Sequence, residues 1–202
     1  MPSVIERAST GRAKCRVCGQ AIARGDERFG EALPNAYGEG EAMFWYHVPC
    51  AACARPEALL PVLDQTSLSA KERARLEDLA RAGVAQGRLC RILRAERASS
   101  GRARCRHCRE LIDQAVWRIS LQIFEDGRFT PVGTIHASCA AGYFGSEPPP
   151  ERFALPNNQL APDELAEVTS LIRDGAARSI QLKGLAKAGA EEPEVKSSRK
   201  TS

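Results

Sequence analysis

The chain has 202 residues, of which 43% are hydrophobic and 5% aromatic, and its formal net charge is +4. The ordinary apolar fraction argues against disorder over the whole chain, and the lack of any run near the roughly 18 apolar residues of a membrane span argues against a membrane protein. The few aromatic residues argue against one large hydrophobic core and favour small domains that need further stabilisation, such as a metal or disulfides.

The eight cysteines are the next clue. The first ten residues, MPSVIERAST, contain no apolar signal-peptide core, so we expect an intracellular and reducing location. In that setting Cys-x2-Cys pairs are more often metal ligands or redox sites than structural disulfides.

The first half of the chain alternates short motifs with segments that favour regular structure. In chain order these are Cys15-x2-Cys18, the strand-like ERFGEAL (27–33), His47-x2-Cys50 and the amphipathic segment 67–83. Ser69 followed by Glu72 predicts a capping box at the start of a helix, and Gly83 predicts its end.

The second half repeats this order. It contains Cys105-x2-Cys108, the strand-like VWRISLQIF (116–124), the turn signal EDG (125–127), His136-x2-Cys139 and the segment 159–175. Pro162 suits the first position of a helix, Val168, Leu171 and Ile172 supply its apolar stripe, and Gly175 predicts its end. The remainder is poor in large apolar residues and predicts a disordered tail over 179–202.

The two halves are copies of one module. ERASTGRAKCRVCGQAI from Glu6 matches ERASSGRARCRHCRELI from Glu96 at most positions, and the His-x2-Cys pair recurs 89 positions later. A repeat that keeps its order over this length predicts two tandem domains, 1–86 and 87–178. The expected fold class is α+β, with a short antiparallel sheet and a C-terminal helix in each module.

Each module offers three cysteines and one histidine as metal ligands. The two sets are Cys15, Cys18, His47 and Cys50, and Cys105, Cys108, His136 and Cys139. Three thiolates and one imidazole complete a tetrahedral shell around a structural zinc ion and leave no position for a reactive water. We therefore expect two structural zinc ions.

Cys53 and Cys90 fall outside this pattern, because neither has a counterpart in the other copy. We interpret both as ordinary small side chains. Cys53 could compete with Cys50 as the fourth ligand, but Cys139 in the second copy favours Cys50. For the Cys-x2-Cys pairs themselves, a thioredoxin-like redox site is the alternative to a metal site, and such a redox site would need no matched histidines.

Positive charge is concentrated around the two Cys-x2-Cys pairs. From Arg88 to Arg118 there are nine arginines against three acidic residues. This distribution predicts a phosphate-facing surface, and a solvated charged face is the alternative.

The stretches ERASTGRAKCRVCGQAI, ERFG and FWYHVPC together resemble the zinc finger of the poly(ADP-ribose) polymerase (PARP) type. The resemblance covers both copies, roughly residues 4–83 and 92–175, although the second copy has GTIHASC in place of FWYHVPC. It implies recognition of DNA strand breaks: basic side chains grip the phosphate backbone, and apolar loop residues stack on the base pair exposed at the break.

The resemblance also implies site residues. Carried over by position, the phosphate contacts are Arg12, Arg16, Arg28, Arg102, Arg106 and Arg118. A solvated or carboxylate-paired arginine is the alternative for each. The stacking positions of the family fall on glycine, alanine and proline in this chain, so the candidates are their neighbours Tyr37, Met43, Phe124 and Phe129.

The two modules and the tail account for the whole sequence, so we expect a binding protein and no enzyme. The leading hypothesis is a DNA-associated protein that engages nicks, ends or gaps, with repair proteins as further partners and neither a membrane nor a small-molecule substrate. It would act in the nucleoid or cytoplasm, or in a nucleus. The alternative is a zinc-stabilised protein-interaction module that does not bind DNA.

Overall fold

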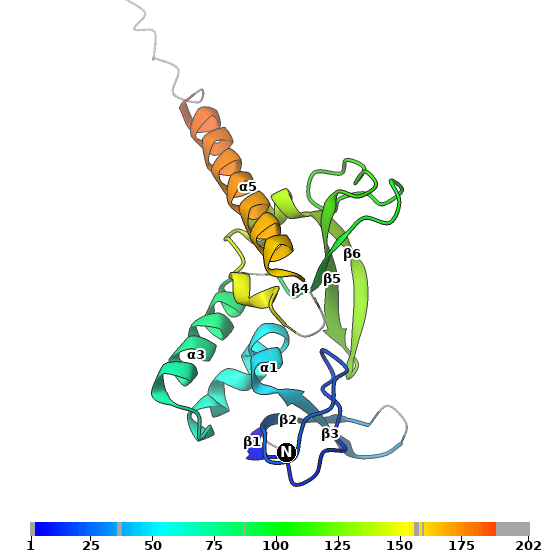
Figure 1. Cartoon of the computed structure of the whole chain (residues 1–202), viewed down its shortest axis with the longest axis vertical. Helices are drawn as coiled ribbons and strands as arrows, with labels where there is room; N and C mark the ends of the chain where they lie inside the picture. The colour runs from blue at the N-terminus through cyan, green and yellow to red at the C-terminus, as the bar shows by residue number, and fades with distance from the viewer. Residues whose placement is uncertain (1–2, 36–37, 87, 156–157, 159, 189–202) are drawn as a thin grey trace, which may run out of the picture.

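In the computed structural model the chain forms two three-stranded antiparallel sheets, each followed by helices (Figure 1). The structure describes residues 3–35, 38–86, 88–155, 158 and 160–188, and only the backbone of 179–188. The expected α+β class with two small modules is confirmed.

The first module runs from the first strand to the third α-helix. Its elements are β1 (Val4–Arg7), β2 (Glu27–Pro34), β3 (Glu41–His47), α1 (Val48–Ala54), α2 (Pro56–Leu59), the 3-10 helix η1 (Leu60–Gln65) and α3 (Ala70–Ala85). Strand β2 is central, and its Phe29 lies opposite Ile5 and Tyr46. These side chains pack with Leu76 of α3 into one core.

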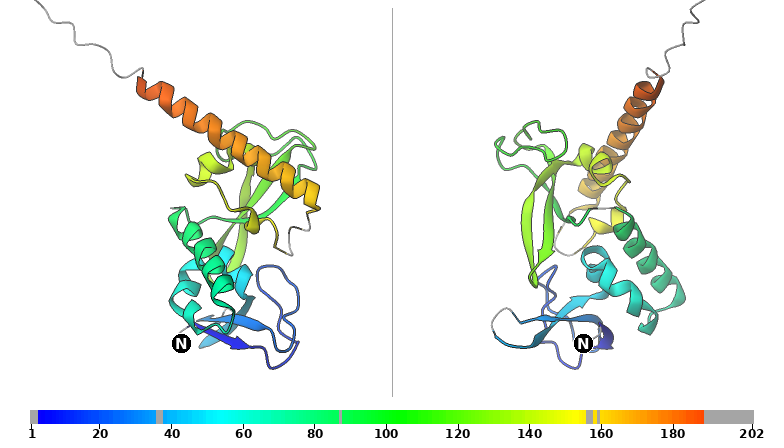
Figure 2. Two further views of the ribbon diagram at one scale, coloured as in Figure 1. Left: turned by 60° about the vertical axis from the view of Figure 1, so that its left-hand side comes forward. Right: turned by 180° about the vertical axis from the view of Figure 1, so that it is seen from behind.

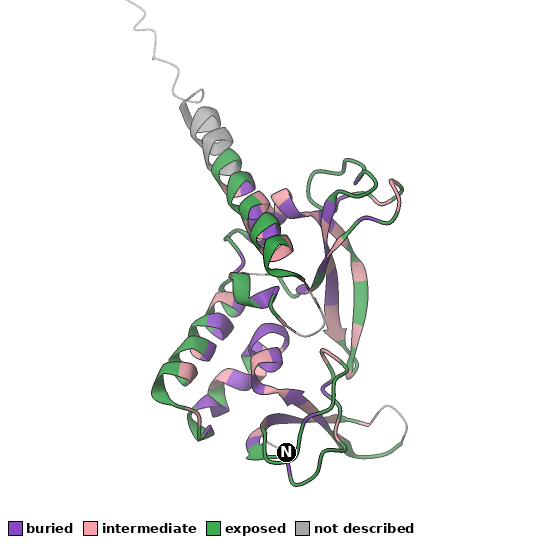
Figure 3. Ribbon diagram, viewed as in Figure 1, coloured by how far each residue is buried: buried purple, intermediate pink, exposed green. Residues whose placement is uncertain are grey.

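The second module repeats the order. Its elements are β4 (Arg91–Arg97), β5 (Trp117–Glu125), β6 (Arg128–His136), the 3-10 helix η2 (Ala137–Cys139), α4 (Ala140–Phe144), the 3-10 helix η3 (Pro150–Arg152) and α5 (Pro162–Ala188). Ile119 pairs with Ile135 across the sheet and packs with Val168 and Ile172 of α5. Buried residues gather on the faces where each sheet and its helices meet, and some loop residues are buried with them (Figure 3).

The predicted turn signals are found where the sequence placed them. Asp126 and Gly127 join β5 to β6 with φ values of +51° and +72°, the left-handed pair that a two-residue hairpin requires. Ser69 caps α3 by accepting a hydrogen bond from the backbone N–H of Glu72 at 3.2 Å. The other half of the predicted capping box is not formed among the described residues: the carboxylate of Glu72 pairs with Arg75 at 2.7 Å on the helix surface and does not bond to the backbone of Ser69.

The predicted helix ends were wrong in both modules. Helix α3 continues past Gly83 to Ala85, and α5 continues past Gly175 to Ala188. Both glycines are buried sites of close packing: a Cβ on Gly83 would lie 2.3 Å from the guanidinium of Arg152, and one on Gly175 would lie 1.8 Å from the carbonyl oxygen of Ser138. At Gly175 nothing larger fits, because the backbone of Ser138 occupies the space, whereas a larger residue at Gly83 would have to displace the Arg152 side chain. Neither glycine ends its helix.

Helix α5 therefore extends away from the second sheet (Figure 2) and takes up part of the segment expected to be a disordered tail. The rest of that segment, 189–202, lies outside the described residues. None of the helices in the described ranges combines the length and the apolar character of a membrane span.

The two modules pack directly against each other. Arg55 of the first module pairs with Glu31 at 2.5 Å and stacks over the ring of Phe124 in the second, 3.9 Å from its centroid. Arg91 pairs with Glu57, and the buried Arg152 donates to the carbonyl oxygen of Cys53 at 3.2 Å. The hairpin β5–β6 and η3 thus hold the second module on the first.

Gly175→Ala tests the packing role of the glycine. Helix propensity alone would stabilise the protein by up to about 1 kcal/mol, whereas the clash with Ser138 should lower the free energy of unfolding by about 1–3 kcal/mol. Thermal unfolding of the zinc-loaded protein decides the sign. The neighbouring exposed substitution Asp174→Ala controls for propensity, and a more stable Gly175→Ala variant would contradict the packing account.

Candidate metal centres

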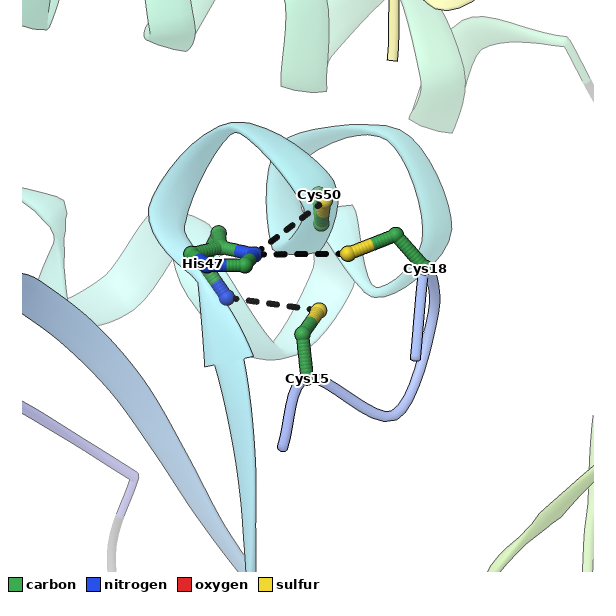
Figure 4. A group of neighbouring side chains, drawn as sticks. All are labelled: Cys15, Cys18, His47 and Cys50. Carbon is green, nitrogen blue, oxygen red and sulfur yellow. Dashed lines mark hydrogen bonds between the residues drawn. The ribbon is translucent and has the colours of Figure 1, made fainter. Parts of the chain in front are cut away.

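The Cys15-x2-Cys18 pair lies on a tight turn. A β-bridge between Lys14 and Ala21 closes its base, and the backbone N–H of Gly19 donates to the carbonyl oxygen of Cys15 at 2.8 Å. Gly19 has φ +73°, a conformation that glycine adopts at little cost. Both sulfur atoms point toward His47 (Figure 4).

The other two ligands lie at the junction of β3 and α1. Strand β3 ends at His47, and α1 begins at Val48 with Pro49 in its first turn. Proline suits this position because the N–H groups of the first turn have no partner within the helix, so the N–H that proline lacks is not needed. One turn of helix brings Cys50 to the same side as His47. The metal set therefore joins the turn near the N-terminus to the strand–helix junction.

The four ligand atoms fit a tetrahedral zinc ion. They all lie within 4.8 Å of one another, and Nδ1 of His47 is 3.4 Å from Sγ of Cys18 and 3.9 Å from Sγ of Cys50. Zinc–sulfur and zinc–nitrogen bonds of about 2.3 and 2.05 Å at a tetrahedral angle place sulfur and nitrogen about 3.6 Å apart. Each centre can thus hold one zinc ion with all four positions filled by protein.

The histidine is oriented by its second ring nitrogen. Nε2 of His47 lies 3.3 Å from the carbonyl oxygen of Ala21, and Nε2 of His136 lies 3.2 Å from that of Leu111. A carbonyl oxygen only accepts, so Nε2 carries the proton and Nδ1 presents its lone pair to the metal. Such outer contacts fix the tautomer and the ring orientation of a zinc-binding histidine.

One sulfur in each module is stabilised as the thiolate. Hydrogen bonding with Cys50 and with backbone N–H groups lowers the pKa of Cys15 to about 4, against the opposing effect of burial. Cys139 acts in the same way on Cys105, whose pKa falls to about 3. The thiolate is the form that binds zinc, so one buried ligand of each set is ready for the metal.

The second centre reproduces the first with nearly the same distances. Nδ1 of His136 lies 3.4 Å from Sγ of Cys108 and 3.9 Å from Sγ of Cys139, and the backbone N–H of His136 is 3.4 Å from Sγ of Cys105. The sequence-predicted ligand sets are the two clusters of the described residues that could hold a metal.

The two centres differ in exposure. Cys18 is half-buried and Cys50 is buried, whereas the equivalent Cys108 is exposed and Cys139 is half-buried. Tyr46, fully buried beside the first centre, is replaced by Ile135 in the second copy. Because its ligands are more exposed, a zinc ion held by the second set would be more open to solvent.

Neither of the remaining cysteines joins a metal set. Cys53 is 4% exposed and packs in the core of the first module, where burial raises the pKa of its thiol to about 11. Cys90 lies beside Tyr143. The interpretation of Cys53 and Cys90 as small side chains outside the zinc sites agrees with the clusters that the structure forms.

No family model matches this chain, and neither does any curated protein. The metal centres thus stand on their own geometry, and the family resemblance of the sequence stays a prediction.

Four of the predicted phosphate contacts are exposed. Arg12 and Arg102 have no ion-pair or hydrogen-bond partner among the described residues. Arg16 lies over the ring of Phe44, 4.4 Å from its centroid, and Arg106 donates to the carbonyl oxygen of Val132.

The other two arginines are paired with carboxylates, the alternative considered for each of them. Arg28 is 8% exposed, pairs with Glu6 at 2.6 Å and lies over the ring of Trp45. Arg118 pairs with Glu96 at 2.9 Å. These pairs tie β2 to β1 and β5 to β4, so both guanidinium groups already serve their own sheets.

The predicted stacking residues are divided between surface and interface. Met43 is 37% exposed on β3. Phe124 and Phe129 stack on each other with centroids 4.8 Å apart, and Phe129 packs against the first core. Tyr37 lies outside the described residues.

Sequence reasoning missed the residues that join the modules. Arg55, Arg91 and Arg152 carry the interface, and the carbonyl groups of Ala21 and Leu111 orient the zinc histidines. One signal in the sequence could have pointed to Arg55: the second copy has Phe144, and no arginine, at the equivalent position 89 residues later. A backbone carbonyl leaves no signal in the sequence.

We expect two zinc ions per chain that a chelator removes at unequal rates, the second centre first, because its ligands are more exposed. A chromogenic chelator follows the release. Cys15→Ala should retain mainly the fast phase and Cys105→Ala mainly the slow one. Fewer than two zinc ions in the reduced, zinc-loaded protein, or the same single phase in both variants, would contradict this assignment.

Arg109→Gly should stabilise the second module by about 0.5–1 kcal/mol. Arg109 takes the place of Gly19 in the second Cys-x2-Cys turn and has φ +70°, a strained conformation for a side-chain-bearing residue. Thermal unfolding of the zinc-loaded protein measures the change, with Gly19→Ala as the reciprocal variant of opposite sign. Equal or lower stability of Arg109→Gly would refute the strain argument.

Proposed function

We propose that this chain is a tandem zinc-finger protein of the PARP type that binds DNA at strand breaks without sequence specificity. One observation carries the proposal. Arg12 and Arg102 occupy matching positions before the two Cys-x2-Cys turns, and both are exposed and without a carboxylate partner among the described residues. Arg28 and Arg118, by contrast, are each paired with a carboxylate of their own sheet.

Unpaired guanidinium groups beside a rigid turn suit phosphate recognition. Arginine presents a planar fork of donors that matches phosphate oxygens, and such contacts fix position on DNA without reading its sequence. Arg16 and Arg106 are exposed next to the same turns and add to the positive field. The zinc ions keep these turns in place, so metal loading and DNA binding are expected to go together.

Preference for a break requires an apolar contact with an exposed base pair. Phe124 and Phe129 are half-buried and stack on each other between the modules, so the exposed Met43 on the β2–β3 hairpin offers the more accessible apolar surface. Stacking or apolar contact of this kind is worth about 1–3 kcal/mol per base.

A binding role also agrees with the metal chemistry, since four protein ligands leave a zinc ion no open position to activate water. The second candidate is a zinc-stabilised module that binds protein only. The engagement of Phe124 within the chain favours it, because Phe129 and Arg55 both contact that ring.

A nicked duplex should compete at least about tenfold better than the same duplex sealed, at fixed salt, for the zinc-loaded full-length chain. Competition fluorescence anisotropy with several unrelated sequences provides the measurement. Equal affinity for nicked and sealed DNA would reduce the activity to general duplex binding, and no binding to either would favour the protein-interaction module.

Arg12→Ala and Arg102→Ala should each weaken DNA binding several-fold and reduce the log–log salt slope by about 0.9, the loss of one phosphate contact. Zinc content and melting should stay unchanged, because both side chains are exposed and unpaired. Arg73→Ala, an exposed arginine on α3, is the matched control for loss of charge. Unchanged affinity in both variants would remove the central argument for DNA binding.

A further inference from the structure

A cleft of about 550 Å³ lies where the second module meets the first. The first module contributes Arg16, Ala42 and Phe44 to its lining, and the tip of the β5–β6 hairpin contributes Asp126, Arg128 and Phe129. The hairpin points toward the first module (Figure 1). Neither module alone forms this cleft.

The hairpin tip is held firmly against the first module. A Cβ on Gly127 would lie 3.5 Å from the ring of Phe44 and 3.8 Å from the carbonyl oxygen of Pro34, so the turn is in contact with both. Behind the tip, Phe124 and Phe129 stack on each other, and Arg55 covers Phe124. The cleft is therefore formed without a ligand, with the hairpin tip and the first module in direct contact.

The charged groups of the cleft favour an anion. Arg16 and Arg128 come from different modules, both are exposed, and neither has a carboxylate partner among the described residues, while Asp126 is the single acid in the lining. Stacking on Phe44 holds the Arg16 guanidinium in place. Two arginine forks at one site suit the oxygens of a phosphate group.

The apolar part of the lining suits a planar ring. Phe129 is half-buried, and Ala42 leaves free space beside it. Aromatic side chains stack on any base because each base has a π-face. A volume of about 550 Å³ is in the range of small-ligand sites and accommodates one nucleotide, whereas stacked base pairs of a duplex are too large to enter.

We propose that this cleft between the modules binds one unpaired nucleotide of a broken strand, with its phosphate on Arg16 and Arg128 and its base against Phe129. The inference rests on the proposed function and refines it: the preferred break would carry an unpaired nucleotide, as a flap, a gap edge or a frayed end does.

The experiment uses the zinc-loaded full-length chain and three duplexes of one sequence: sealed, nicked, and nicked with a one-nucleotide 5′ flap. Competition anisotropy at fixed salt gives the flap-to-nick and nick-to-sealed affinity ratios. We expect a flap-to-nick ratio of about five to ten. A ratio of one overturns the inference and leaves the nick-to-sealed ratio as the separate measure of the proposed function.

Variants locate the effect. Arg128→Ala removes a cation, and Ala42→Leu fills the cleft without changing its charge; each should bring the flap-to-nick ratio below about twofold and keep nick affinity within about twofold. Arg73→Ala, with the same loss of charge on the distant α3, should keep the flap preference. A flap preference that survives both cleft variants, or that Arg73→Ala also abolishes, overturns the assignment to this cleft.

Discussion

The coordination of a zinc ion by three thiolates and one imidazole is the constraint on which each module depends. The sheets have three strands and the cores are small, so local packing alone gives marginal stability. The metal joins the Cys-x2-Cys turn to the start of the following helix, two parts of the chain nearly 30 residues apart. In such domains the free energy of metal binding is largely free energy of folding. Loss of the metal is therefore expected to loosen the arginine-bearing turns.

The repeat and its divergence have different physical roles. Both copies contain the four metal ligands and the carbonyl groups that orient the histidines, because each metal site needs the same geometry. Both copies also contain the arginine before the Cys-x2-Cys turn. The residues that join the modules occur in one copy only, since an interface between two unlike surfaces cannot be built from identical patches. Arg55 on one side and Phe124 on the other are an example. The two modules thus form one asymmetric unit, in which the two Cys-x2-Cys turns have a defined position relative to each other.

Patterns that arise from local chemistry could be predicted from the sequence. The zinc ligands, the strand at 27–33, the hairpin turn at Asp126 and Gly127, and the Ser69 cap all follow from residue type and spacing. The helix ends could not be predicted, because a glycine that admits a carbonyl oxygen looks the same in sequence as one that stops a helix. Nor could the pairing of Arg28 with Glu6, since strand register decides which carboxylate an arginine meets.

X-ray absorption at the zinc edge of the fully loaded protein tests the central claim most directly. Two closed centres predict an average first shell of three sulfur atoms at about 2.3 Å and one nitrogen atom at about 2.05 Å, with no water oxygen. An average of clearly more than three sulfur atoms would show that a cysteine replaces the histidine in at least one centre, and a shell with oxygen would show an open site. Either result would contradict the Cys3His centres on which the account rests.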